Sequence, residues 1–73
     1  MITSDEAIEI ARRATVGKAT LQEGAPIHVE RKGDRFVVVF VHHNPPGVRG
    51  PDYDAKVTID ADAGHVIQIL GAS

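Results

Sequence analysis

The chain has 73 residues, of which 42% are hydrophobic and 25% charged, a formal net charge of −2 and no cysteine. These values predict one globular domain over residues 1–73, stabilised by apolar packing without disulfides or thiolate metal sites. The slightly acidic charge gives no reason to expect binding to nucleic acid or an anionic membrane, and no apolar run approaches the ~20 residues of a membrane span.

The first predicted element is a helix over residues 4–16. Thr3 and Glu6 fit the capping-box pattern, in which each residue satisfies the backbone amide of the other. An apolar stripe then recurs at helical spacing through Ala7, Ile8, Ile10, Ala11 and Ala14. Gly17 follows as the predicted stop.

Two strands, over residues 27–32 and 35–42, are predicted around Gly33-Asp34, a two-residue hairpin signal. This register places Val29 opposite Val38. One face then carries Ile27, Val29, Phe36, Val38 and Phe40, and the opposite face carries His28, Glu30, Val37, Val39 and Val41. A slip of one residue would exchange the two faces.

Residues 43–52 contain three prolines and two glycines, which predicts an irregular loop. Residues 53–60 alternate as a third strand, with Tyr53, Ala55, Val57 and Ile59 on one face and Asp54, Lys56, Thr58 and Asp60 on the other. A turn over residues 60–64 leads into a fourth strand over residues 65–70, whose Ile67 and Ile69 are expected on the core face.

The predicted fold class is therefore α+β: one N-terminal helix packs on one face of a four-stranded antiparallel meander, in the order 1-2-3-4. The predicted core consists of Ile8, Ala11, Val29, Phe36, Val38, Phe40, Val57, Ile59, Ile67 and Ile69.

Three segments in this order resemble a PepSY domain, the module named for peptidase propeptides. They are the opening helix over residues 2–11, the Phe36-Val37-Val38-Val39-Phe40 strand, and the closing hairpin over residues 57–67. The resemblance spans nearly the whole chain and implies the helix-on-sheet arrangement of PepSY and cystatin-like domains. Such domains occur in propeptides of thermolysin-like secreted peptidases and in stand-alone bacterial proteins. The resemblance implies a non-catalytic module that binds a protein or peptide and restrains or inhibits a peptidase.

Polar residues with the chemistry of a metal site are present, but their spacing does not favour one. His42 and His43 are adjacent on a strand end and point to opposite faces, while His28 lies about three residues along the strand from His42. Asp60, Asp62 and Gly64 match the start of a calcium loop, but the glycine falls one position early and no glutamate follows. We predict a turn there, with no metal and no cofactor.

No catalytic constellation is predicted either. The chain has no nucleophile elbow, phosphate loop or dinucleotide fingerprint, and Ser4 and Ser73 lie at its ends. Asp52 and Asp54 bracket Tyr53 and could pair as acids, but we expect both side chains to be solvated. The expectation is a protein that is not an enzyme.

One helix, ~10 Å wide, covers only one face of a four-stranded sheet. The uncovered face would carry Val37, Val39, Val41, Val66 and Leu70. We predict a partner-binding surface made of this face and the proline loop, with Val37, Val39, Val41, Pro45, Pro46 and Arg49 as the candidate contacts. The alternative is a structural domain that forms a homodimer through the same face.

The start of the chain bears on its localisation. Thr3-Ser4-Asp5-Glu6 is acidic and polar where a signal peptide has a basic flank and an apolar stretch. As written, the chain is expected to stay where it is made, in the cytoplasm. An excised domain of a longer protein could instead be secreted or periplasmic.

Overall fold

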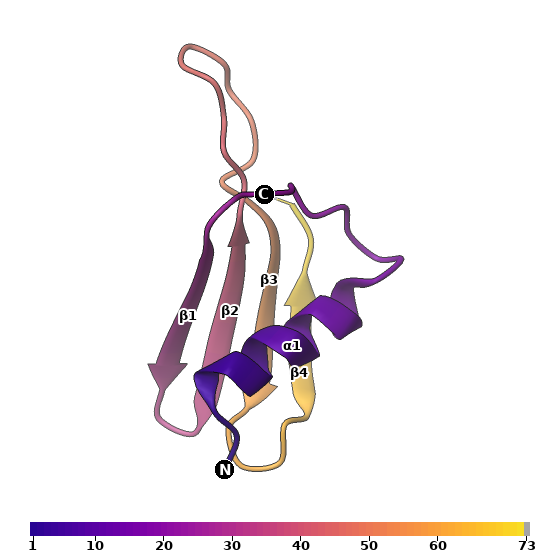
Figure 1. Cartoon of the computed structure of the whole chain (residues 1–73), viewed down its shortest axis with the longest axis vertical. Coiled ribbons are helices and arrows are strands. Elements are labelled where there is room, and N and C mark those ends of the chain that lie inside the picture. Colours follow the sequence, from indigo (N-terminus) through magenta and orange to yellow (C-terminus); the bar gives the residue numbers. More distant parts are fainter. Residues whose placement is uncertain (73) are drawn as a thin grey trace.

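The computed structural model describes residues 1–72 and contains one helix on a four-stranded antiparallel sheet (Figure 1). The elements are α1 (Ser4–Thr15), β1 (Ile27–Lys32), β2 (Arg35–Val41), β3 (Tyr53–Asp60) and β4 (Val66–Leu70). The strands are ordered β1-β2-β3-β4, and α1 crosses one face of the sheet and contacts all four strands. The predicted α+β class and meander order are confirmed. None of the described helices is long and apolar enough to cross a membrane.

The helix begins at the predicted capping box. The Thr3 hydroxyl accepts a hydrogen bond from the Glu6 amide at 3.1 Å, and the Glu6 carboxylate accepts one from the Thr3 amide at 3.0 Å. The amide of Ile2 donates to the Ala61 carbonyl at 2.7 Å, which ties the helix start to the end of β3. At the other end, Gly17 has a positive φ of 75°, which a residue with a side chain rarely adopts.

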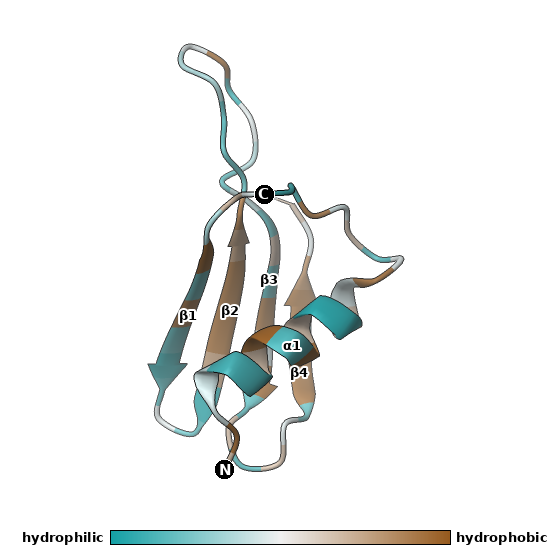
Figure 2. Cartoon of the chain, viewed as in Figure 1, coloured by the Kyte–Doolittle hydropathy of each residue, from teal (hydrophilic) through white to brown (hydrophobic). Residues whose placement is uncertain are grey.

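The first hairpin has the predicted register, with Val29 opposite Val38 and Ile27 opposite Phe40. Its inner residues join the helix in a buried core that comprises Ala7, Ala11, Phe36, Val38, Phe40, Ala55, Val57, Ile59 and Ala61. Strand β2 is apolar along most of its length, whereas the lower half of β1 is hydrophilic (Figure 2). The core therefore centres on β2, β3 and the inner side of α1.

Two β-bulges change which face some side chains of β3 and β4 point to, so the predicted facing of these strands is partly wrong. In the first, Phe40 pairs with Ala55 and Val41 pairs with Tyr53, so Asp54 is an extra residue. This puts Tyr53 on the face of Val41 and leaves Asp54 buried, at 8% exposure, where a solvated side chain was predicted. In the second, Thr58 pairs with Gln68 and Ile59 with Val66.

The second bulge leaves Ile67 as the extra residue on β4. Its side chain is 48% exposed, so its predicted place in the core is wrong. Its neighbour Ile69 does pack against the core, in a partly buried position opposite Val57. The edge strand thus contributes one isoleucine to the core and leaves the other at the surface.

The helix depends on its cap. Thr3→Ala removes the side-chain acceptor of the Glu6 amide and should lower the free energy of unfolding by ~1 kcal/mol. In a domain of this size the melting temperature should fall by several degrees. Thr20→Ala, at an exposed loop position, is the matched control and should leave it unchanged. Equal melting temperatures for the two variants would contradict the capping role.

The core depends on Phe40. This side chain is 4% exposed, and Phe40→Ala should cost about 3–5 kcal/mol through lost burial and the cavity left behind. That loss is comparable with the whole stability of a small domain. Chemical denaturation followed by circular dichroism should show a largely unfolded variant, whereas Val48→Ala, in the loop, should unfold like the parent chain.

Candidate functional site

The outer face is the side of the sheet that α1 does not cover. Its central residues are Val37, Val39 and Val41 of β2, which are all half-buried. Strand pairing puts Tyr53 beside Val41. The structure therefore brings the three predicted valines together in one row with an aromatic neighbour.

Polar side chains border this row on both sides. Val39 lies between His28 of β1 and Lys56 of β3, and Lys56 in turn pairs with Leu70. Two residues further along β2, Val37 lies between Glu30 and Thr58. An apolar centre with a polar and charged rim is the usual anatomy of a protein-binding surface.

The β2–β3 loop (residues 42–52) extends well beyond the end of the sheet (Figure 1). Its exposed residues include Pro45, Pro46 and Arg49, together with Val48, which is 56% exposed. The Val48 amide donates to the Pro45 carbonyl at 3.1 Å and closes the tip. The three predicted loop contacts are thus exposed on a projecting arm, separate from the valine row.

Two hydrogen bonds join the two sides of this arm near its base. The His42 amide donates to the Asp52 carbonyl at 3.1 Å. The Asn44 side-chain amide donates to the Pro51 carbonyl at 2.9 Å. Together with the three prolines of the loop, these bonds limit the number of conformations open to the arm.

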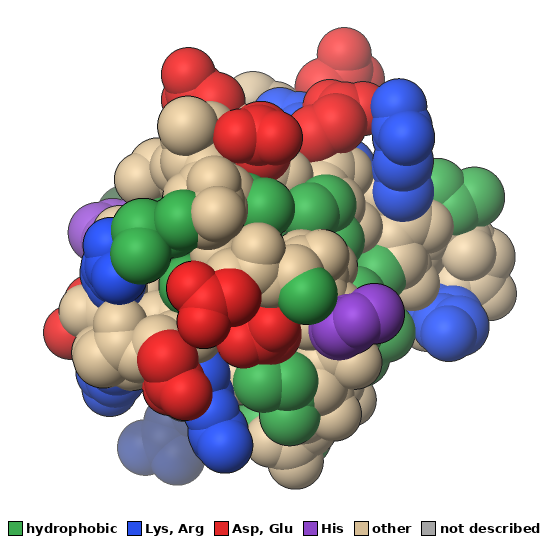
Figure 3. All heavy atoms as spheres, turned by 90° about the horizontal axis from the view of Figure 1, so that it is seen from below, with side chains coloured by type: hydrophobic (Ala, Val, Ile, Leu, Met, Phe, Trp, Pro, Cys, Tyr) green, Lys and Arg blue, Asp and Glu red, His purple; other side chains and the backbone are tan. Residues whose placement is uncertain are grey.

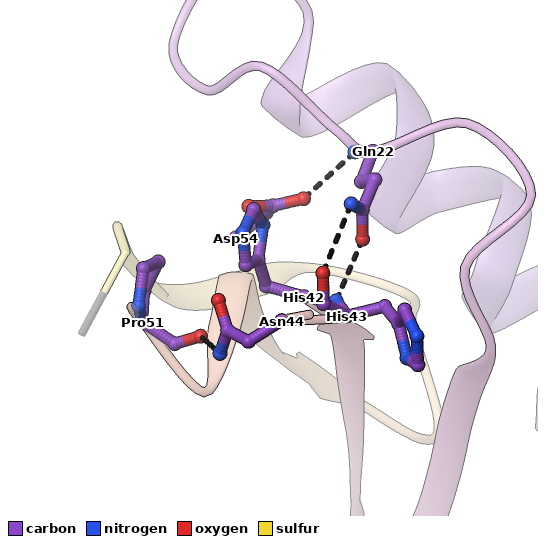
Figure 4. Close-up of polar contacts among 6 residues, drawn as sticks. All are labelled: Gln22, His42, His43, Asn44, Pro51 and Asp54. Carbon is purple, nitrogen blue, oxygen red and sulfur yellow. Dashed lines mark hydrogen bonds and ion pairs between the residues drawn. The ribbon is translucent and has the colours of Figure 1, made fainter. Parts of the chain in front are cut away.

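A cluster that we call the Gln22 clamp anchors the arm to the rest of the fold (Figure 4). It consists of Gln22, His42, His43 and Asp54. The Gln22 side chain accepts from the His43 amide at 2.6 Å and donates to the His43 carbonyl at 3.2 Å. The side chain of Gln22 therefore bonds to the loop as a neighbouring strand would.

Asp54 completes the clamp. One of its carboxylate oxygens accepts from the backbone amide of Gln22 at 2.7 Å, and the other lies 2.8 Å from His42 Nδ1. Three segments thus meet at one buried carboxylate: the connection after α1, the end of β2 and the start of β3. The bulge that turns Asp54 inward makes this arrangement possible.

Sequence reasoning missed the clamp. Gln22 lies in a loop 32 residues before Asp54, and a period-two pattern places Asp54 on the outer face. The one available signal was that Asp54 and His42 flank the proline loop at the ends of two successive strands. Such flanking residues are candidates for a bond across the loop base.

The predicted turn at residues 60–64 is confirmed, because the Asp60 carboxylate accepts from the Ala63 amide at 2.9 Å. Among residues 1–72, no group of three or more His, Asp or Glu side chains could hold a metal ion. His42 is instead engaged by Asp54. That the chain binds no metal and is not an enzyme stays a prediction from the sequence.

Two other surfaces of the molecule are hollowed or charged. A cleft of about 260 Å³ lies beside β2 and is lined by Arg12, Leu21, Phe40 and the residues 22–27 connection, which also lines a neighbouring hollow of about 330 Å³. The end that carries the β1–β2 and β3–β4 turns presents interspersed acidic and basic side chains with only small apolar areas (Figure 3). Neither gathers an apolar row like that of the outer face.

Comparison of the chain with protein-family models, with curated proteins and with solved structures finds no match.

The clamp should be structural. Asp54→Ala leaves the Gln22 amide and His42 without their acceptor in a partly buried site, which should cost about 1–3 kcal/mol of stability. Amide exchange at His43 should also become faster, because the arm loses its anchor. Asp52→Ala, at an exposed position two residues earlier, is the control and should change neither quantity. Identical behaviour of the two variants in thermal unfolding and hydrogen exchange would reject the anchor.

Proposed function

We propose that this chain is a non-catalytic protein-binding module of PepSY type, which binds a partner with its outer face and the β2–β3 loop. The observation that carries the proposal is the row of Val37, Val39 and Val41 on the face that α1 leaves uncovered. The PepSY resemblance supports a peptidase as the partner, which the module would restrain or inhibit.

The energetics support this face as the contact surface. Burial of apolar area contributes roughly 25 cal/mol per Å². A partner that covered the valine row would remove the remaining exposed surface of three β-branched side chains from water. These side chains are already fixed by strand pairing, so their ordering on binding costs little.

The β2–β3 loop supports the same proposal in a second way. A projecting arm reaches a recess that a flat sheet cannot enter, and the Gln22 clamp holds it in place before the partner arrives. Preorganisation of this kind lowers the entropic cost of binding. Pro45, Pro46 and Val48 supply apolar contact at the tip, and Arg49 supplies a positive charge.

A second candidate function is self-association through the same outer face. The face carries Glu30 and Lys56 on opposite sides of the valine row, so a second copy could pair opposite charges around a shared apolar centre. This candidate predicts a dimer without any other partner. The two candidates make different predictions for the same substitution.

Val39→Lys tests both candidates. The side chain is half-buried on the outer face, so a folded variant is expected by circular dichroism, and its new charge would be buried in any complex formed there. We expect the Kd for a partner captured from the native host to rise roughly tenfold or more. Val16→Lys, at a position that is 76% exposed at the end of α1, on the opposite side of the sheet from the outer face, is the matched control.

The outcomes separate the parts of the proposal. A partner that binds Val39→Lys as tightly as the parent chain would remove the outer face from the proposal, and Arg49→Glu would then test the loop. Capture of proteins that include no peptidase would reject the peptidase as partner. A dimer that dissociates in Val39→Lys, with no captured protein, would favour self-association.

A further inference from the structure

The projecting β2–β3 arm carries one strongly basic side chain. Every Lys and Arg of the chain except Lys18 and Arg49 lies within α1 or a strand. Lys18 is held in a turn directly after α1, where its amide donates to the Thr15 carbonyl at 3.0 Å. Arg49 is exposed, and among residues 1–72 it takes part in no ion pair. Its guanidinium is therefore available to a partner on a segment that extends beyond the sheet (Figure 1).

The backbone around Arg49 is open to a partner as well. The tip turn ends where the Val48 amide donates to the Pro45 carbonyl at 3.1 Å. From Val48 to Gly50 the chain forms no helix, strand or turn, and Pro51 disfavours a helical backbone at Gly50. Exposed loop segments of this kind are the preferred sites of attack by peptidases.

Asn44 supports the peptide bond between Arg49 and Gly50 from the other side of the arm (Figure 4). Its side-chain amide donates to the Pro51 carbonyl at 2.9 Å. A Cβ on residue 50 would collide with the Asn44 Oδ1 atom, so the backbone of Gly50 packs more closely on Asn44 than a larger residue could. The chain is thus fixed on both sides of this bond, by the tip turn before it and by Asn44 after it.

We propose that the arm enters the active-site cleft of a serine endopeptidase that cleaves after basic residues, and that it inhibits this enzyme. Arg49 occupies the primary specificity pocket, where an acidic group selects arginine and forms paired hydrogen bonds with its guanidinium. This inference rests on the proposed function and narrows its partner from a peptidase to one of trypsin-like specificity.

The support from Asn44 is what makes the arm an inhibitor and not a substrate. The serine hydroxyl adds to the Arg49 carbonyl carbon, and its proton passes through the enzyme's histidine to the nitrogen of Gly50, which leaves as an amine. Water then hydrolyses the ester, so that Arg49 ends as a carboxylic acid and the serine recovers its proton. Because Asn44 holds Gly50 in place, the amine stays beside the ester and re-forms the peptide bond before water enters.

Trypsin is the probe for this inference. The parent chain should inhibit its hydrolysis of a small chromogenic arginine amide competitively, and Arg49→Ala should raise the inhibition constant roughly a hundredfold or more. Arg12→Ala, at an exposed position on α1, is the matched control and should inhibit like the parent chain. A parent chain without effect at millimolar concentration, or an Arg49→Ala variant of equal strength, would overturn the inference.

Exchange of the side chain in the pocket gives a second test. Arg49→Phe should lose the inhibition of trypsin and gain inhibition of chymotrypsin, whose pocket is hydrophobic. The arm is exposed at this position, so the variant is expected to fold like the parent chain. Unchanged inhibition of trypsin by Arg49→Phe would show that Arg49 does not occupy the pocket.

The fate of the Arg49–Gly50 bond tests the role of Asn44. Mass spectrometry should find slow cleavage of the parent chain by trypsin at this bond. Asn44→Ala should be cleaved there roughly tenfold faster and should inhibit more weakly, because the new amine is no longer held. Rapid cleavage of the parent chain without inhibition would make the arm a substrate and would overturn the inhibitory role.

Val39→Lys separates this inference from the proposed function. The valine row is apart from the arm, so this variant should inhibit trypsin as well as the parent chain does while losing its partner from the native host. Failure to inhibit trypsin, together with capture of a host peptidase that depends on Val39, would overturn this inference alone. Inhibition of trypsin through Arg49, with no peptidase captured through the outer face, would support this inference and reject the role of that face.

Discussion

The structure depends on one constraint: a single helix must stabilise a sheet of four strands. Helix α1 meets this constraint by crossing the sheet so that it contacts every strand. Its buried residues are small, namely Ala7, Ala11 and Thr15, which lets the helix approach closely while β2 and β3 supply the large core side chains. The opposite face receives no cover, and β2 has valine there at every second position. The uncovered valine row of the outer face follows from this one-sided packing.

The Gln22 clamp shows how a small domain anchors a long loop without a further helix or sheet packed against that loop. The core cannot reach the β2–β3 loop, because that loop lies beyond the end of the sheet. A buried carboxylate at Asp54 takes the place of apolar contacts and joins the loop base to the connection after α1. Such a carboxylate is tolerated because both of its oxygens have partners. The same connection that leads the chain from helix to sheet therefore also supports the projecting arm.

Local signals predicted most of the fold, and interactions between distant residues account for what they missed. The Thr3–Glu6 cap, the Gly33-Asp34 hairpin and the alternation along β2 each lie within a few residues, so the helix, the register and the strand order could be derived. The bulges could not, because alternation in the sequence continues unchanged through Asp54 and Ile67 while the backbone gains an extra residue. The valine row could be predicted because it depends only on alternation within β2. The clamp could not, because Gln22 bonds to residues far along the chain.

The bulge in β4 also bears on how the edges of the sheet are protected. Bulges often protect an edge by twisting it away from potential partners. Here the irregularity falls between the pairs Thr58–Gln68 and Ile59–Val66, so Val66 lies on the core face with Ile59, whereas Gln68 and Leu70 lie on the outer face with Thr58 and Lys56. This breaks the regular alternation of side chains that another strand would need along the whole of β4. The other edge strand, β1, is protected in a different way, by the consecutive charges of Glu30–Lys32.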